Sequence, residues 1–211
     1  MRTTILAVGA CLAALMLSER VVAQDGPKAE RPQVAVGDSW VFERTERGSG
    51  AKSEVTRKVL AIGADDLTIA STESGTDTEQ KWTRDLNYVS GDGKRVFKPH
   101  NQTLAFPLWV GRQWKVDAKG VNAGGRDITL EGSCKAVAHE KVTVKAGSFD
   151  AFKVECDFEF YIFGPGTRGT TRLVYWYSPA LKFPVRSELM NRDRLTVFTD
   201  WTQELVSTTV K

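Results

Sequence analysis

The sequence has few of the residues and motifs that mark metal sites and enzymes. Its 211 residues include only two histidines and three cysteines. Neither His100 nor His139 has a second histidine or a cysteine at the spacing of a zinc site. No serine stands in a G-x-S-x-G nucleophile elbow, and Gly91–Lys94 is predicted to be a hairpin turn rather than a phosphate loop, because no helix follows it. We therefore expect no metal, no cofactor and no catalytic residue.

An excess of charge of one sign is also absent. The chain has 29 Lys and Arg against 26 Asp and Glu, and without Arg2, Arg20 and Glu19 of the first 23 residues the balance is 27 to 25. Nucleic-acid binding needs a concentrated basic face, so we expect no nucleic-acid partner. The longest apolar run, Ile5–Leu17, has 13 residues and is too short to span a bilayer as a helix. We therefore expect no stable membrane anchor.

The N-terminal segment has the three parts of a secretory signal peptide. Arg2 gives a positive start, Ile5–Leu17 forms the apolar core, and small residues precede Gln24. We predict cleavage after Ala23, which removes residues 1–23 and leaves a disordered tail (24–33) and one domain (34–211). The alternative is a lipoprotein, because Val8–Cys11 resembles a weak lipobox. The compact signal predicts a bacterial periplasmic or secreted protein.

A period of two residues dominates the rest of the chain. In Phe152–Ile162 every second residue is apolar, as in a strand with one buried face. Similar runs recur between turn sequences, and no helical period extends beyond a turn or two. This pattern predicts an all-β fold, an antiparallel meander that forms a half-barrel, barrel or sandwich. The predicted strands are Ser39–Glu46, Glu54–Ile62, Asp66–Thr72, Glu79–Asp85, Arg95–Phe97, Arg112–Asp117, Asp127–Ala138, Lys141–Lys145, Phe152–Phe163, Thr170–Tyr177, Pro184–Leu189 and Arg194–Ser207.

A faint internal repeat divides the domain. Val36–Trp40 (VGDSW) returns as Val110–Trp114 (VGRQW), and Lys58–Ile69 loosely echoes Lys135–Val144. These pairs suggest two similar β halves, residues 34–108 and 109–211. The alternative is that V-G-x-x-W is simply a common way to begin a strand.

Two cysteines remain once the signal peptide, with Cys11, is removed. In an oxidising compartment Cys134 and Cys156 are expected to form one disulfide.

The apolar pattern around the two cysteines conflicts with this bond. It pairs Val144 with Phe152 around a loop at Ala146–Asp150, which places the two cysteines about 20 Å apart along the strands. A disulfide needs Cα atoms within about 7 Å. The bond therefore requires a bulge or a strand break between Val137 and Val142.

Three carboxylates lie on one face of the predicted strand at Phe152–Phe163. Glu155, Asp157 and Glu159 could form a calcium or magnesium site, but the predicted register sets Lys141 opposite Glu155 and His139 opposite Asp157. Opposite charges across strands are an ordinary way to cover a solvent-exposed face. We therefore predict a charge-paired surface and no metal site.

Aromatic residues supply the remaining candidate site. Tyr175, Trp176 and Tyr177 place large rings on both faces of one strand. In a half-barrel such rings could line a cavity for an apolar ligand. The alternative is that they fill the core.

The segments AGSFDAFKVE (146–155) and YWYSPALKFPVRSE (175–188) resemble the TapB-like group of secreted bacterial β proteins, a family of domains of unknown function. The match lies mainly over residues 133–190. The resemblance implies an exported β domain, related in shape to half-barrel periplasmic lipoprotein carriers, and it implies no catalytic residue. The matching residues are Val142, Val144, Ala146–Ala151, Lys153, Val154, Tyr175–Pro179 and Arg186.

These observations together predict an exported, non-enzymatic β domain that serves as a scaffold or a binding module. The alternative is a periplasmic carrier of a lipid or another apolar small molecule. A hydrolase is the least favoured class, although a Ser–His–Asp triad assembles in space rather than in sequence.

Overall fold

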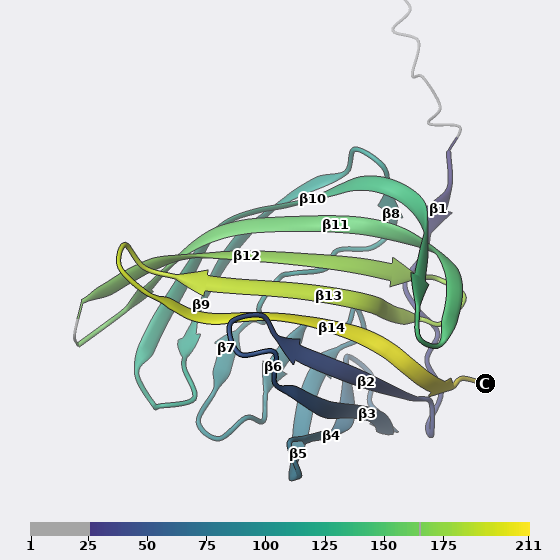
Figure 1. Cartoon of the computed structure of the whole chain (residues 1–211), viewed down its shortest axis with the longest axis horizontal. Helices are drawn as coiled ribbons and strands as arrows, with labels where there is room; N and C mark the ends of the chain where they lie inside the picture. The colour runs from purple at the N-terminus through teal and green to yellow at the C-terminus, as the bar shows by residue number, and fades with distance from the viewer. Residues whose placement is uncertain (1–25, 165) are drawn as a thin grey trace, which may run out of the picture.

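The computed structural model describes residues 26–164 and 166–211, and this part of the chain is all β (Figure 1). Twelve antiparallel strands form a closed barrel in the order β10-β11-β12-β13-β14-β2-β3-β4-β5-β6-β7-β9, and β1 and β8 form a separate two-stranded sheet. The predicted fold class is confirmed. The strands are β1 Lys28–Ala29, β2 Ser39–Glu46, β3 Lys52–Ile62, β4 Asp66–Glu73, β5 Thr76–Thr83, β6 Tyr88–Ser90, β7 Val96–Lys98, β8 Leu108–Trp109, β9 Gln113–Val121, β10 Asp127–Val144, β11 Gly147–Ile162, β12 Thr167–Ser178, β13 Phe183–Arg192 and β14 Val197–Thr209.

The described N-terminal residues differ from the expectation of a disordered tail at 24–33. Lys28 and Ala29 pair with β8, and Ala29 is buried. Arg31 forms an ion pair with Asp85. These contacts hold the segment against the barrel. The signal peptide (1–23) and its cleavage site lie outside the described residues, and none of the described residues forms a helix that is long and apolar enough to cross a membrane.

The β10–β11 hairpin resolves the conflict between register and disulfide. Residues 127–144 form one strand rather than two, with a bulge between Ala136 and Ala138. The turn is tight, so Val144 lies opposite Gly147, five residues from its predicted partner Phe152. The predicted loop at Ala146–Asp150 is therefore wrong. The bulge adds one residue to β10, which changes the face of every side chain beyond it.

The same change of register alters the cross-strand neighbours of the acidic face. Lys141 lies opposite Asp150, and His139 lies opposite Phe152 with the two ring centroids 4.7 Å apart. The predicted pairs of Lys141 with Glu155 and of His139 with Asp157 are wrong.

The two V-G-x-x-W segments have the same local structure. Gly37 and Gly111 adopt φ angles of 92° and 98°, a region that favours glycine. Their N–H groups donate to the carbonyl oxygens of Val59 and Ala136, at 2.9 and 2.7 Å. In each case the tryptophan that follows is the second residue of a strand, β2 or β9, and the bonded partner directly precedes a register shift. Six barrel strands, β2–β7, follow the first segment and six, β9–β14, follow the second.

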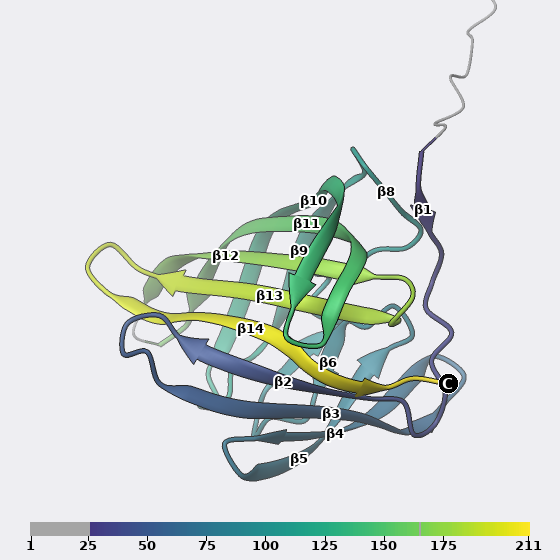
Figure 2. The ribbon, with the colours of Figure 1, turned by 45° about the vertical axis from the view of Figure 1, so that its right-hand side comes forward.

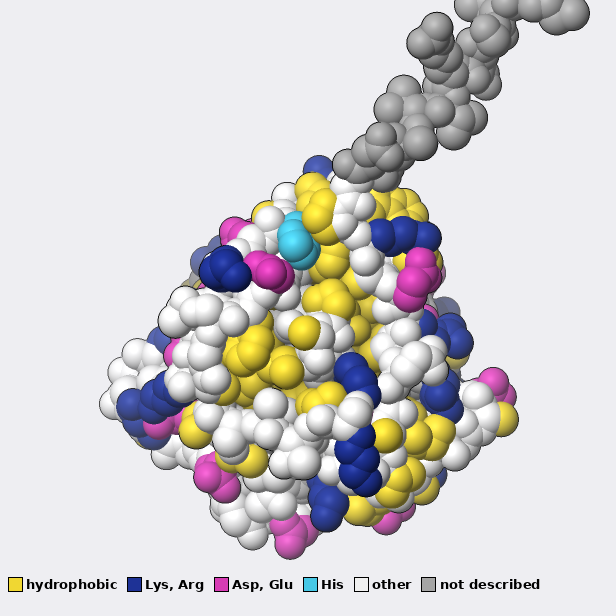
Figure 3. Space-filling model, turned by 90° about the vertical axis from the view of Figure 1, so that its right-hand side faces the viewer, with side chains coloured by type: hydrophobic (Ala, Val, Ile, Leu, Met, Phe, Trp, Pro, Cys, Tyr) yellow, Lys and Arg dark blue, Asp and Glu magenta, His cyan; other side chains and the backbone are white. Residues whose placement is uncertain are grey.

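One end of the barrel is sealed by aromatic side chains and by the β10–β11 hairpin. Trp40 and Phe183 stack with centroids 4.5 Å apart, and Phe42 packs beside them. The hairpin bends over this end until the N–H of Ala146 donates to the carbonyl of Leu205 in β14 at 3.0 Å (Figure 2). Seen end-on, hydrophobic side chains gather in the middle of this end, with polar and charged ones around them (Figure 3). We call it the sealed end.

Candidate functional site

The three aromatic residues predicted to line a cavity do not share one face of β12. Tyr175 and Tyr177 lie opposite Val154 and Phe152 and face the barrel interior. Trp176 faces outward, where its Nε1 donates to Glu140 at 2.7 Å and its ring lies near the cations of Lys153 and Arg186. Trp176 therefore does not line the interior.

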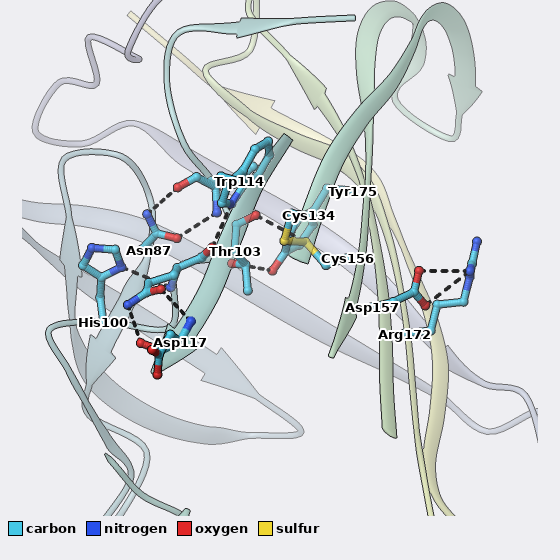
Figure 4. The surroundings of a disulfide bond; sticks show 12 residues. Asn87, His100, Thr103, Trp114, Asp117, Cys134, Cys156, Asp157, Arg172 and Tyr175 are labelled. Carbon is cyan, nitrogen blue, oxygen red and sulfur yellow. Dashed lines mark hydrogen bonds and ion pairs between the residues drawn. A yellow bond between two sulfur atoms is a disulfide. The ribbon is translucent and has the colours of Figure 1, made fainter. Parts of the chain in front are cut away.

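Residues 99–107, the inner segment, pack against both tyrosines. Thr103 is buried, and its hydroxyl lies 3.4 Å from the hydroxyl of Tyr175 (Figure 4). The ring of Phe106 packs edge-on against Tyr177 with centroids 5.0 Å apart. Asn87 holds the segment by hydrogen bonds to the N–H and carbonyl of Leu104, each 2.8 Å long. At this level the interior is filled by the chain itself.

The disulfide joins two strands of the barrel wall beside the inner segment. Cys134 and Cys156 lie directly opposite each other on β10 and β11, are bonded, and are buried (Figure 4). The Sγ of Cys156 lies 3.6 Å from the carbonyl oxygen of Thr103. The predicted disulfide is confirmed: the tight turn moves the register by five residues, and the bulge after Ala136 supplies the sixth that sets the two cysteines opposite each other.

Tyr175 differs from Tyr177 in how far its side chain is covered. Burial raises the pKa of its phenol, yet the side chain is only partly covered. A side chain that lies deep in a fold and still contacts solvent is typical of one that lines an accessible space. Tyr177, by contrast, is buried, and burial also raises its pKa.

Toward the far end of the barrel, which we call the accessible end, Leu189 and Trp201 face inward and are only partly covered, as Tyr175 is, whereas most inward-facing apolar side chains of β10–β12 are buried. β10, β11 and β12 contribute an apolar wall there, with Leu130, Phe160 and Leu173. The facing strands contribute Trp201 and Arg44, whose guanidinium carbon lies 4.5 Å from the centre of the indole. One wall is thus apolar and the other is aromatic and polar, which suits an amphipathic partner.

Two arginines dominate the polar wall. Arg44 forms an ion pair with Glu73 and donates to Gln203 at 3.2 Å, and its buried Nε has no partner among the described residues. Arg57 donates to Ser71 at 2.5 Å, and its guanidinium lies 3.8 Å from Glu73. Burial, reinforced by the nearby Arg44 charge, lowers the pKa of Arg57 to about 10. The sequence prediction missed these arginines, although the alternation in β2 places Arg44 on the face of Trp40 and Phe42.

Two hairpin tips lie at the accessible end (Figure 1), and each carries exposed apolar side chains. In the β13–β14 hairpin Leu195 is 94% exposed and Phe198 is 51% exposed, and in the β11–β12 loop Phe163 is 47% exposed. The Asp193 carboxylate accepts hydrogen bonds from the N–H groups of Leu195 and Thr196, both 2.7 Å long, and so fixes the tip. Exposed apolar groups gathered in this way mark interaction sites.

The carboxylate row on β11 is a charge-paired surface. Arg172 of β12 lies 3.0 Å from Glu155 and 3.3 Å from Asp157. Lys153 lies 2.9 Å from Glu155, and its hydrogen bond is the largest of the interactions that lower the pKa of that carboxyl. The predicted charge pairing holds for Glu155 and Asp157, with Arg172 and Lys153 as the cations, whereas Glu159 lies opposite Glu131. In the described part of the chain no cluster of three potential metal ligands occurs.

Comparison with known proteins finds solved structures that are similar in fold but no similar sequence. No family model matches the chain, and no curated protein matches its sequence. A candidate lipoprotein from Parabacteroides distasonis ATCC 8503 has a TM-score of 0.51 at 12% identity, over 86% of this chain and 99% of that one. A candidate exported protein with a YmcC-like fold from Bacteroides fragilis NCTC 9343 gives 0.49 at 15%, over 86% and 99%. The hypothetical lipoprotein YmcC from Escherichia coli (K12) gives 0.44 at 11%, over 81% and 84%. The first of these structures shares the fold of this chain.

Proposed function

We propose that the chain is an exported β-barrel domain that serves as a binding module rather than as an enzyme. Its partner is apolar or amphipathic and binds at the accessible end. One observation carries the proposal: the two ends of the barrel differ. The sealed end is packed with aromatic rings and covered by a hairpin, whereas the accessible end exposes Leu195, Phe198 and Phe163 beside the partly covered, inward-facing Tyr175 and Trp201.

Export has support of two kinds. A buried disulfide is typical of proteins in oxidising compartments. The fold is shared with a protein described as a candidate lipoprotein. We assign the chain to the bacterial periplasm or exterior, with cleavage after Ala23. The resemblance to the TapB-like group is part of this proposal. The mass of the exported protein tests the predicted cleavage after Ala23, since lipid modification at Cys11 would give a different N-terminus and added mass.

A second candidate function is the carriage of a lipid within the barrel. Tyr175, Leu189 and Trp201 face inward and are each only partly covered, which favours it. In this case the hairpin tips would guide the lipid toward the space lined by these residues.

Binding of an uncharged apolar probe, N-phenyl-1-naphthylamine, tests the site. Full burial of a leucine or phenylalanine side chain is worth roughly 1.5–3 kcal/mol, so Leu195→Ser with Phe198→Ser should weaken binding tenfold or more. Val36→Ser is the matched control, because Val36 is 51% exposed and lies outside these hairpin tips. Equal binding by both variants would refute the assignment.

Native mass spectrometry of the exported protein separates the two candidates. One retained lipid per chain favours the carrier, and an empty chain that still binds the probe favours the module. Loss of a measured turnover on replacement of one polar residue would instead show that the protein is an enzyme.

A further inference from the structure

A hollow of about 380 Å³ lies on the outer face of the barrel wall. Most of its lining side chains from β7, β9 and β10 alternate with the inward-facing Phe97 and Ala118, so they point away from the interior, and Ile128, on the face of the buried Leu130, is the exception. The hollow therefore opens mainly outside the wall, beside the accessible end, with which it shares Phe163. Its lining residues are Val96, Lys98, Lys119, Gly120, Val121, Asp127, Ile128, Thr129 and Phe163.

Two lysines in this lining form a like-charged pair. Lys98 and Lys119 are directly opposite each other on β7 and β9. Cβ atoms of directly opposed residues lie about 4.5–5.5 Å apart, and like charges in this arrangement are destabilising. Among the described residues neither ammonium has a carboxylate partner, and Asp127 lies on the next strand opposite Val121 rather than opposite either lysine. The pair is thus a local conflict, of the kind expected at binding sites.

Apart from Asp127 and Thr129, the rest of the hollow is apolar and aromatic. Val96 and Val121 are paired beside the lysines, and Phe163 contributes an aromatic wall. The Phe163 ring is held edge-on by Tyr161 with centroids 4.7 Å apart, although its side chain is 47% exposed. Positioned aromatic rings that remain uncovered suit the flat face of a ligand.

We propose that this outer hollow binds a small amphipathic anion: an apolar or aromatic body that bears one carboxylate, sulfonate or phosphate. The anionic group binds between Lys98 and Lys119 and removes their repulsion. The body packs on Val96, Val121 and Phe163. A volume of about 380 Å³ suits a small molecule, since ligand pockets usually span about 300–1,000 Å³. The lysine pair is not part of the accessible end, so the proposal does not depend on the function assigned there, although the two sites share Phe163.

A matched pair of probes tests this proposal. 8-Anilinonaphthalene-1-sulfonate carries a sulfonate, and N-phenyl-1-naphthylamine has the same rings without it. The double variant Lys98→Gln/Lys119→Gln should bind the sulfonate at least tenfold more weakly, with less than a twofold change for the uncharged probe. Lys115→Gln/Lys135→Gln is the control, because it removes the same charge from exposed positions of β9 and β10 outside the hollow.

Two further readouts keep the result unambiguous. The lysine double variant should unfold at an equal or higher temperature than the native chain, because a repulsion is removed, and Phe163→Ser should weaken binding of the sulfonate. Equal sulfonate binding by the double variant and its control would overturn the proposal. It would also be overturned if the lysine variant lost binding to phosphatidylglycerol vesicles but not to the free sulfonate. Failure of the uncharged probe to bind at all would count against the accessible end and leave the lysine comparison intact.

Discussion

The Cys134–Cys156 disulfide should contribute about 3 kcal/mol to the free energy of unfolding. The bonded residues are 22 positions apart, and the loss of loop-closure entropy in the unfolded chain for a loop of this length gives that value at 25 °C. Replacement of the two cysteines with alanine should itself lower the free energy of unfolding only a little further, because alanine is small and apolar and both positions are buried in an apolar core. The double variant Cys134→Ala/Cys156→Ala should therefore remain folded but be markedly less stable.

Equilibrium unfolding in urea measures the difference directly. The oxidised chain should have the highest free energy of unfolding. The chain reduced with a phosphine and the double variant should have lower values that are similar to each other. For a domain of this size 1 kcal/mol shifts the melting temperature by about 2–4 °C, so the expected fall is roughly 6–12 °C. The reductant should have no effect on the double variant, which is the control.

A difference below about 1 kcal/mol would refute the entropy argument. It would show that the unfolded chain already keeps the β10–β11 hairpin closed, so that the bond restricts nothing further. A large fall in the double variant without one in the reduced chain would instead assign the effect to lost packing.

Three other predictions concern the two faces of β11, the close backbone contact at Gly132 and the charge of Asp38. Phe158→Asp should unfold the domain by burying an unpaired charge, whereas Glu159→Lys on the exposed face should change stability by at most about 0.5 kcal/mol; similar thermal melts would contradict the face assignment. Gly132→Ala should cost about 1–3 kcal/mol in urea unfolding, because its Cβ would lie 2.3 Å from a carbonyl oxygen of β11, and Gly48→Ala, with open space around it, is the control. Burial alone would raise the pKa of Asp38, but hydrogen bonds from backbone N–H groups and a lysine ammonium lower that pKa in the folded chain. The ionised carboxylate therefore stabilises the fold above about pH 4, and this stabilisation is lost as the pH falls through the folded pKa. Asp38→Asn should thus destabilise the chain in urea at pH 7 and much less at pH 3, and a deficit independent of pH would contradict this.

Most strands could be predicted from alternation alone, since a one-sided core requires it. Ser39–Glu46 is a strand with the predicted limits, and the inward face of β11 is the predicted one. The short strand Tyr88–Ser90 was missed because three residues are too few to show a period. The order at Lys28–Ala29 was missed because only pairing with a distant segment, β8, creates it.

The register of β10 against β11 could not be predicted from apolar matching. The pairing of Val144 with Phe152 would join two apolar side chains, whereas the actual partner, Gly147, has no side chain. Tight-turn geometry decided the register, because Gly147 adopts a φ of 133° that few other residues tolerate. The disulfide was the better constraint, since a covalent bond limits the register to a few positions.

The candidate site corresponds to a change from apolar to polar or partly covered side chains along the inward face of single strands. In β2 that face runs from Trp40 and Phe42 to Arg44, and in β14 it runs from Trp201 to Leu205 in the opposite direction, as antiparallel neighbours must. Both strands are apolar at the sealed end and become polar or accessible toward the other. A uniform core would need no such gradient, and a motif search cannot detect it because no residue in it is diagnostic by itself. When the strands are aligned in the barrel, the changes in the separate strands occur at the same end and define one accessible end. This agreement between strands, rather than any one residue, argues for a binding function.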